Sequence, residues 1–295
     1  MTQPALLLNN GVSIPRLGLG TWQAKDGSEV EQTVTAALSV GYRLIDTAAA
    51  YGNEPGIGKA INKSPIPRNE LFITTKVWNA DQGYDQTIKA FDKSLKRLGL
   101  HYIDLYLIHW PMPAADKYIN TWRAMEELYK TGKVRAIGVC NFSIEQLERL
   151  AAETSIVPMV NQIELHPYFV QTDLRNYCTQ NNIAIEAYSP LGGSTGKLLE
   201  DPVIVNIADA HSITPAQVVI RWHIQQGHIV IPKSTHTERI TSNAQVFDFE
   251  LNPDEMTRID ALDKNERIGT DPNTANFNWN TNLVQIAHYL GLVHW

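Results

Sequence analysis

Residues Gly41–Glu54 read GYRLIDTAAAYGNE, and this segment carries the clearest structural signal in the chain. Tyr42 to Ile45 has the composition of a short buried strand, and a run of small residues follows it. Asp46 stands where this strand ends, and Tyr51 lies on the loop that leads to the next helix. In a barrel of parallel strands, active-site residues lie at the carboxyl ends of the strands. An isolated Asp and Tyr are more often a turn cap and a packed ring, so their meaning depends on the rest of the chain.

Strand-like and helix-like segments alternate through that rest. Ala5 to Leu19 alternates in polarity and breaks at Asn9-Asn10-Gly11, which predicts a β-hairpin. The eight strands predicted for a barrel lie in Gly18–Thr21, Tyr42–Ile45, Leu71–Thr75, Ile103–Ile108, Val134–Val139, Met159–Ile163, Ile183–Ala187 and His228–Ile231. Strands that alternate with helices, without a repeat or a break in composition, indicate a parallel sheet wrapped by helices. The predicted fold is therefore an α/β (β/α)8 TIM barrel with an N-terminal β-hairpin and an extra C-terminal helix. We expect one domain over residues 1–295, of which about 277–295 form a variable tail.

Capping signals predict where several helices begin. A Ser or Thr followed three residues later by Gln or Glu has the form of a capping box, and an N-cap residue before proline also starts a helix. The signals are Ser143 with Gln146, Thr235 with Glu238, Thr214-Pro215 and Asn252-Pro253.

Composition excludes several classes of partner. The net charge of −6 provides no basic surplus for nucleic acid or an acidic membrane. Cys140 and Cys178 are the two cysteines, which implies neither a disulfide framework nor a thiolate metal cluster, and we predict no metal site. The chain starts without a basic region and a long apolar core, and no apolar run approaches roughly eighteen residues. We therefore expect a cytoplasmic protein that contacts neither membrane nor nucleic acid.

Polar side chains stand at the carboxyl ends of three successive predicted strands. Asp46, Lys76 and His109 occupy these ends, and Tyr51 lies just beyond the first. Consecutive strand ends are neighbours in a barrel, so these four side chains can meet there. A lone strand-end lysine is usually solvated, and a histidine before Trp110 is usually packed, but four such groups on three adjacent strands favour a shared site.

This combination is typical of a carbonyl reductase. Tyr51 would be the general acid that protonates a developing alkoxide, and an unperturbed tyrosine, with a pKa near ~10, needs help for this role. Lys76 close to the phenol would lower that pKa, and Asp46 would keep Lys76 charged and oriented. His109 would hydrogen-bond the substrate oxygen and fix its position.

A reductase needs a hydride source, yet the usual dinucleotide fingerprint is missing. Gly18-Leu19-Gly20 lacks the third glycine, Gly52 to Gly58 has the wrong spacing, and there is no P-loop or His-Glu-x-x-His motif. A barrel can instead hold the phosphate of a cofactor at its last strand and the start of the following helix. The segment Ile231–Arg239 offers two cations, hydroxyl groups and helix N–H groups at that place.

The chain resembles the aldo-keto reductases from about Leu7 to Leu262. The long, specific motifs that carry this resemblance are Gly41–Glu54, Leu98–Pro111, Gly132–Phe142, Val160–Pro167 and Ile231–Arg239. Within the family it is similar to the bacterial 2,5-diketo-D-gluconate reductase and methylglyoxal reductase group, partly through Trp110–Asp116. The resemblance implies a barrel that uses NADPH (NADP+) to reduce aldehydes and small ketones to alcohols.

The resemblance also implies individual roles. The catalytic tetrad would be Asp46, Tyr51, Lys76 and His109, the four residues that the strand ends select. Asn141 and Gln162 would bind the nicotinamide carboxamide, and Tyr188 would stack on the nicotinamide ring. Ser189 and Leu191 would touch the pyrophosphate, and Asn243 would contact the adenine. A ribose 2′-phosphate would be held by Lys233, Ser234 and Arg239, and the remaining cofactor-binding residues would be Gly20, Thr21, Trp22, Asp46, Cys140 and Thr235. The substrate pocket would contain Trp22, Tyr51, Trp78, His109 and Trp110.

Four places differ from the family pattern, and one of them is Ser242, which replaces a frequent glutamate near the adenine and should loosen the contact with the base. Cys140 stands where many members have serine, so we expect one carboxamide hydrogen bond to be weak or absent. The loop Gly192–Lys197 is short, which predicts an open cofactor cleft. The tail matches nothing familiar, and we hypothesise that its aromatic residues, Phe277, Trp279, Tyr289 and Trp295, fold over the rim and narrow the substrate pocket.

Two other functions stay open. The first is a sugar or xylose reductase, but the short loop and the bacterial-type motifs argue against it. The second is a barrel that binds NADP as a redox sensor with little turnover, against which the intact tetrad speaks. We expect a monomer whose partner is a small-molecule carbonyl substrate.

Overall fold

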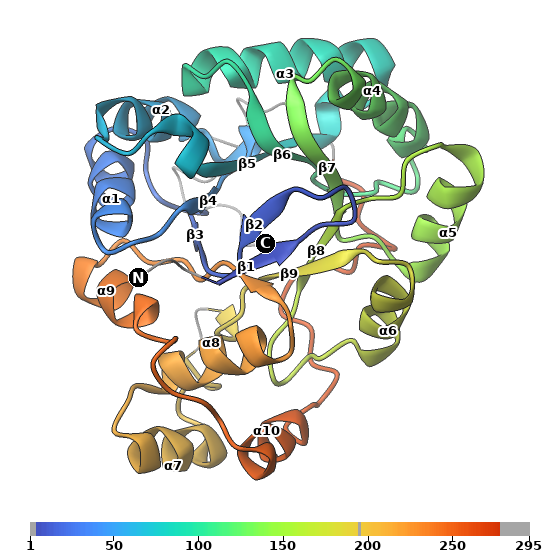
Figure 1. The fold of residues 1–295 in the computed structure, drawn as a ribbon. Helices are drawn as coiled ribbons and strands as arrows, with labels where there is room; N and C mark the ends of the chain where they lie inside the picture. The colour runs from blue at the N-terminus through green and yellow to red at the C-terminus, as the bar shows by residue number, and fades with distance from the viewer. Residues whose placement is uncertain (1–3, 194–195, 278–295) are drawn as a thin grey trace.

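A barrel of eight parallel strands forms the centre of the protein, with helices around it (Figure 1). The computed structural model describes residues 4–193 and 196–277. Going round the barrel in chain order, the strands are β3 (Gly18–Gly20), β4 (Leu44–Asp46), β5 (Phe72–Val77), β6 (Ile103–Ile108), β7 (Val134–Cys140), β8 (Val160–Glu164), β9 (Ala184–Tyr188) and β10 (Ile229–Val230). The predicted (β/α)8 barrel is therefore confirmed.

The barrel closes between its first and last strands. The backbone N–H of Val230 donates to Arg16 O at 2.9 Å, and that of Gly20 donates to Pro232 O at 3.1 Å. Gly20 permits this contact, because a Cβ at that position would lie 2.8 Å from the carbonyl oxygen of Ile231. The carboxyl ends of β3 and β10 thus become neighbours, and the rim of the barrel is continuous.

Helices follow the strands and cover their outer faces. The ring consists of α1 (Ser28–Ser39), α2 (Glu54–Lys63), α3 (Tyr84–Leu98), α4 (Tyr118–Lys130), α5 (Ile144–Glu153), α6 (Thr172–Gln180), α8 (Pro215–Gln225) and α9 (Thr237–Ala244). Two more helices, α7 (Pro202–His211) and α10 (Pro253–Asp260), lie outside this ring on the side of α8 (Figure 1). They share a second, smaller apolar cluster with α8, centred on Trp222. Helix α10 is the predicted additional C-terminal helix.

The N-terminal hairpin covers one end of the barrel. Strands β1 (Ala5–Leu7) and β2 (Ser13–Pro15) pair antiparallel, as predicted, and lie across the barrel opening (Figure 1). Asn9 Nδ2 donates to Pro158 O and Asn182 O, each at 3.1 Å. These two residues lie just before β8 and β9, so the hairpin closes the amino ends of the strands and leaves the carboxyl ends for a site.

Most predicted element bounds lie within a residue or two of the observed ones, but two differences have physical causes. The capping box at Thr235 is wrong: α9 begins at Thr237, and the N–H of His236 donates to Ser234 Oγ at 3.1 Å. Ser234 therefore makes the turn before the helix, one residue earlier than predicted. Helix α7 was not predicted, although Asp201 caps it by accepting the N–H of Val203 at 2.9 Å.

No single helix within residues 4–193 and 196–277 is long and apolar enough to cross a membrane. Helices α7 and α8 reach that length and composition only together, and they meet at an angle of 93°.

Candidate active site

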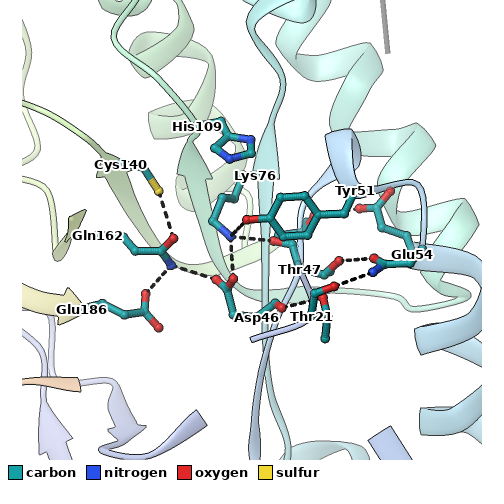
Figure 2. Close-up of polar contacts among 12 residues, drawn as sticks. Thr21, Asp46, Thr47, Tyr51, Glu54, Lys76, His109, Cys140, Gln162 and Glu186 are labelled. Atoms are coloured by element: carbon teal, nitrogen blue, oxygen red, sulfur yellow. Dashed lines mark hydrogen bonds and ion pairs between the residues drawn. The ribbon is translucent and has the colours of Figure 1, made fainter. Parts of the chain in front are cut away.

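Asp46, Tyr51, Lys76 and His109 come together at the carboxyl ends of β4, β5 and β6 (Figure 2). Lys76 Nζ donates to Asp46 Oδ1 at 2.6 Å, to Thr47 O at 3.0 Å and to Tyr51 Oη at 3.3 Å. Tyr51 reaches this point from the short 3₁₀ helix η1 (Ala49–Tyr51), which turns the chain back over the end of β4. The rings of Tyr51 and His109 lie edge to face with centroids 5.6 Å apart. The structure thus brings all four predicted residues into one cluster.

Burial and charge set the protonation states of this cluster. Burial lowers the pKa of Lys76, but the Asp46 carboxylate and the Tyr51 phenol more than offset it, so the pKa is raised and Lys76 stays charged. Burial raises the pKa of Tyr51, and the charge of Lys76 lowers it only in part. The contribution of Lys76 has the predicted sign, but the predicted net lowering is wrong because burial outweighs it. Tyr51 is therefore a neutral phenol, able to donate a proton.

His109 is held neutral at the same place. Burial and the neighbouring charge of Lys76 hold the pKa of His109 well below its usual range. Its Nδ1 atom is buried and has no hydrogen-bond partner among the described residues. A neutral imidazole that packs against the Tyr51 ring has one nitrogen that donates and one that accepts, so it can hydrogen-bond a ligand oxygen.

A second polar layer supports Asp46 from across the barrel. Gln162 Nε2 donates to Asp46 Oδ2 at 2.8 Å and to Glu186 Oε2 at 2.9 Å, while Cys140 Sγ donates to Gln162 Oε1 at 3.5 Å (Figure 2). Burial and the Asp46 carboxylate raise the pKa of Glu186 to about 8. Glu186 was not predicted as a site residue, although an acid inside the apolar strand Ile183–Ala187 is a signal that could have found it.

Asn141, predicted to bind the nicotinamide carboxamide, and Tyr188, predicted to stack on the nicotinamide ring, lie next to this layer. Tyr188 Oη donates to Asn141 Oδ1 at 2.8 Å, and Asn141 Nδ2 donates to His109 O at 3.1 Å. Asn141 has a φ of 64°, in the left-handed region that asparagine tolerates better than most residues. This turn directly after β7 places the Asn141 amide beside the tetrad.

The predicted phosphate-binding residues lie on the neighbouring rim. Ser234 and Asn243 are buried, whereas Lys233 and Arg239 are exposed, and neither cation forms an ion pair within the described part of the chain. Arg239 therefore does not pair with its neighbour Glu238. Thr235 is half-buried beside them, and Ser189 and Leu191 follow the adjacent strand β9. Two such cations next to the start of α9 suit a phosphate group.

Aromatic side chains pack next to Tyr51 and His109. Trp22 contacts Tyr51 with ring centroids 4.7 Å apart, and Trp78 contacts His109 at 5.3 Å. Phe277 stacks on Trp78 at 6.1 Å and meets Trp110 edge to face at 5.1 Å. The structure thus brings the predicted pocket residues together and places the first tail aromatic against them. Trp279, Tyr289 and Trp295, like Ser194 and Thr195 of the short loop, lie outside the described residues.

The last predicted residues, Gly20 and Thr21, join β3 to the tetrad. Thr21 Oγ1 donates to the carbonyl oxygen of Asp46 at 2.8 Å, and Thr21 O accepts from Asn53 Nδ2 at 2.9 Å. Asn53 also binds Thr47 Oγ1 at 2.7 Å, so this buried network fixes the loop that carries Tyr51. Thr21 thus helps to hold the backbone around the site.

Comparison with known proteins agrees with this geometry. The protein-family model described as "Aldo/keto reductase family" matches residues 16–264 of this chain. A glyoxal reductase of Bacillus subtilis (strain 168) is 53% identical over 265 residues, which cover 90% of this chain and 95% of that protein. A point mutant of Gox0644, solved in complex with NADPH, is 47% identical with a TM-score of 0.89, and the match covers 94% of this chain and all of that one. The Bombyx mori aldo-keto reductase solved with NADP is 39% identical with a TM-score of 0.85, covering 92% and 96%.

NADPH or NADP is bound in these two solved structures, and the residues of this chain fit that cofactor. Gln162 and Asn141 present amide groups beside an aromatic ring, and Lys233 and Arg239 are exposed cations on the neighbouring rim. The family match over most of the sequence, the closed barrel and the clustered tetrad all lead to one conclusion. This chain belongs to the aldo/keto reductase family, uses NADP(H), and acts on carbonyl and alcohol groups of small molecules.

Proposed function

We propose that this protein is an NADPH-dependent reductase of aldehydes and small ketones, and that Asp46, Tyr51, Lys76 and His109 are its catalytic residues. The observation that carries the proposal is the contact between Lys76 Nζ and Tyr51 Oη at 3.3 Å, with the lysine held by Asp46 at 2.6 Å. A neutral phenol that touches a buried ammonium group is equipped to donate a proton and then to carry negative charge.

Each residue then has a distinct task. The nicotinamide, when bound, supplies the hydride. Tyr51 donates its proton to the carbonyl oxygen as that oxygen gains charge, and Lys76 stabilises the phenolate that is left. Asp46 keeps Lys76 charged and aimed at Tyr51, while neutral His109 hydrogen-bonds the carbonyl oxygen and orients it. The rings of Trp22, Trp78 and Trp110 would exclude water from this point.

The preference for NADPH over NADH would come from the rim beside α9. Within the described ranges Lys233 and Arg239 form no ion pair, although the charge of Glu29 acts on Lys233, and a 2′-phosphate adds close to two negative charges. We propose that these two cations and Ser234 bind that phosphate. Asn141 and Gln162 would bind the carboxamide, Tyr188 the ring, and Asn243 the adenine.

Small 2-oxoaldehydes are the substrates that we propose first. The glyoxal reductase among the relatives supports methylglyoxal, and the sequence motifs support diketo-sugar acids as a second group. The packing of Phe277 against Trp78 and Trp110 supports the proposal that the tail supplies part of the wall of the substrate pocket.

The test is NADPH oxidation with methylglyoxal and 4-nitrobenzaldehyde, measured for the wild type, Tyr51→Phe and Tyr84→Phe. Tyr51→Phe should keep NADPH binding and lose ~10²–10⁴-fold in kcat, the contribution typical of a general acid. Tyr84 is exposed at 44% in the first turn of α3, and no described contact joins it to the tetrad, so Tyr84→Phe should keep wild-type rates. If Tyr51→Phe kept more than about a tenth of the wild-type kcat, the role of Tyr51 would be wrong.

The same assay separates the two rival functions. A wild type that binds NADPH tightly but reduces no carbonyl compound would be the redox-sensor barrel. Higher kcat/KM for xylose than for methylglyoxal would point to a sugar reductase instead.

A further inference from the structure

Three polar side chains form one layer inside the barrel. The strand register pairs Cys140 of β7 with Gln162 of β8, and Gln162 with Glu186 of β9. Parallel strands in this register point the three side chains the same way, and all three are buried. The layer touches the tetrad through the hydrogen bond between Gln162 and Asp46 (Figure 2).

Both amide hydrogens of Gln162 are occupied by carboxyl groups. One goes to Asp46 Oδ2 at 2.8 Å and the other to Glu186 Oε2 at 2.9 Å. Asp46, ion-paired with Lys76, can only accept, so the nitrogen of Gln162 must face it. The oxygen of Gln162 is left facing Cys140, whose thiol at 3.5 Å is a weak donor. Gln162 therefore presents an acceptor that no strong donor among the described residues occupies.

Glu186 closes the arrangement from the side opposite Asp46. Without it, the second N–H of Gln162 would be buried with no acceptor, which is costly, and the amide would rotate toward another partner. The charged and titratable groups around Glu186 are Asp46, Lys76 and Cys140. Its Oε2 atom can accept from Gln162 whether or not the carboxyl group carries a proton.

We propose that Glu186 is a positioning residue for the cofactor. By accepting the second amide hydrogen of Gln162, it fixes Gln162 Oε1 as the acceptor for the N–H of the nicotinamide carboxamide. This inference rests on the proposed function, specifically on Gln162 as a ligand of the carboxamide.

Substitutions of Glu186 and a cofactor analogue test this role. Glu186→Met has a similar volume but no acceptor, whereas Glu186→Gln keeps one. The probes are NADP+ and its 3-acetylpyridine analogue, in which a methyl ketone replaces the carboxamide and removes the N–H donor. Binding is measured by calorimetric titration, and Gln162→Met is titrated in parallel.

We expect Glu186→Met to weaken NADP+ by about 2- to 13-fold, the ratio that one neutral hydrogen bond corresponds to, and to leave the analogue unchanged. Glu186→Gln should bind both like the wild type. An equal loss for both ligands, or no loss for NADP+, would overturn the positioning role. Glu186→Leu repeats the measurement if Glu186→Met does not fold.

The parallel variant separates this outcome from a failure of the proposed function. Gln162→Met should also lose affinity for NADP+ but not for the analogue. If Gln162→Met showed no such selectivity, Gln162 would not be the carboxamide ligand, and the role of Glu186 would fall with it. A selective loss in Gln162→Met alone would keep the cofactor site and refute only the role of Glu186.

Discussion

Acid should destabilise this protein through His223, a histidine that is buried next to the segment that follows β9. His223 on α8 is fully buried, and its Nε2 lies 3.5 Å from Pro190 O, in the segment Ser189–Leu191 that follows β9. Burial lowers the pKa of His223 to about 3, and the hydrogen bond to Pro190 offsets this only in part. The charged and titratable groups that lower it further are His166 and Arg175. His223 is therefore neutral in the folded protein and gains a proton on unfolding.

The size of the effect follows from this pKa. The unfolded chain, with a histidine pKa of about 6.5, binds more protons than the folded protein at every pH between about 3 and 6.5. The stability due to neutral His223 is therefore complete above pH about 6.5 and is lost as the pH falls through this window. One pKa unit corresponds to about 1.4 kcal/mol, so a fall from pH 7.5 to pH 5 should cost about 2 kcal/mol from His223 alone.

Urea unfolding at pH 7.5, 6.5, 5.5 and 5.0 measures this loss. His223→Gln should reduce the fall in the free energy of unfolding by about 2 kcal/mol at pH 5 relative to the wild type. His101 is exposed, so His101→Gln controls for the removal of one histidine. If His223→Gln and His101→Gln followed the wild-type pH dependence equally, His223 would not be held neutral by burial.

Three further predictions concern the cofactor, the fold and the tail. Arg239→Ala should weaken NADPH by roughly 10–1,000-fold and leave NADH nearly unchanged in fluorescence titrations, and equal losses would place the phosphate elsewhere. Asp104 is buried between Arg68 and Arg135, so Asp104→Ala should lower the free energy of unfolding in urea by about 3–5 kcal/mol. The exposed Glu250→Ala should lower it by about 1 kcal/mol or less, and similar losses for the two variants would refute the stabilising role of Asp104. Truncation after Asp271 should raise KM for bulky aldehydes more than for methylglyoxal, and unchanged KM values would remove the tail hypothesis.

The fold and the meeting of the tetrad could be predicted because both follow from local signals. Strands and helices alternate in an apolar pattern, and neighbouring strand ends meet in any parallel barrel. That rule alone predicts that Asp46, Lys76 and His109 lie close together, without knowledge of any contact between them. The capping signals at Ser143 and Asn252 are equally local, and both were observed.

What could not be predicted depends on partners distant in sequence. The hydrogen bond between Gln162 and Asp46 spans the barrel interior, and Glu186 reads in the sequence as one acid in an apolar strand. The net pKa of Tyr51 depends on how completely the folded chain excludes water from it, which no local pattern reveals. The turn at Ser234 competed with an equally plausible capping signal one residue later.

Closure of the barrel through Arg16 and Val230 makes the order of synthesis matter. A chain leaves the ribosome from its N-terminus at about 5–20 residues per second, and β10 emerges long after His109. A nascent chain that ends just after β6 already holds every tetrad residue, yet Gln162 has not reached Asp46 and the edge of β3 is unpaired. Such open edges invite pairing with other chains, and long-range pairing is slow. Chaperones should therefore bind this chain during translation, until its final barrel strand has been made.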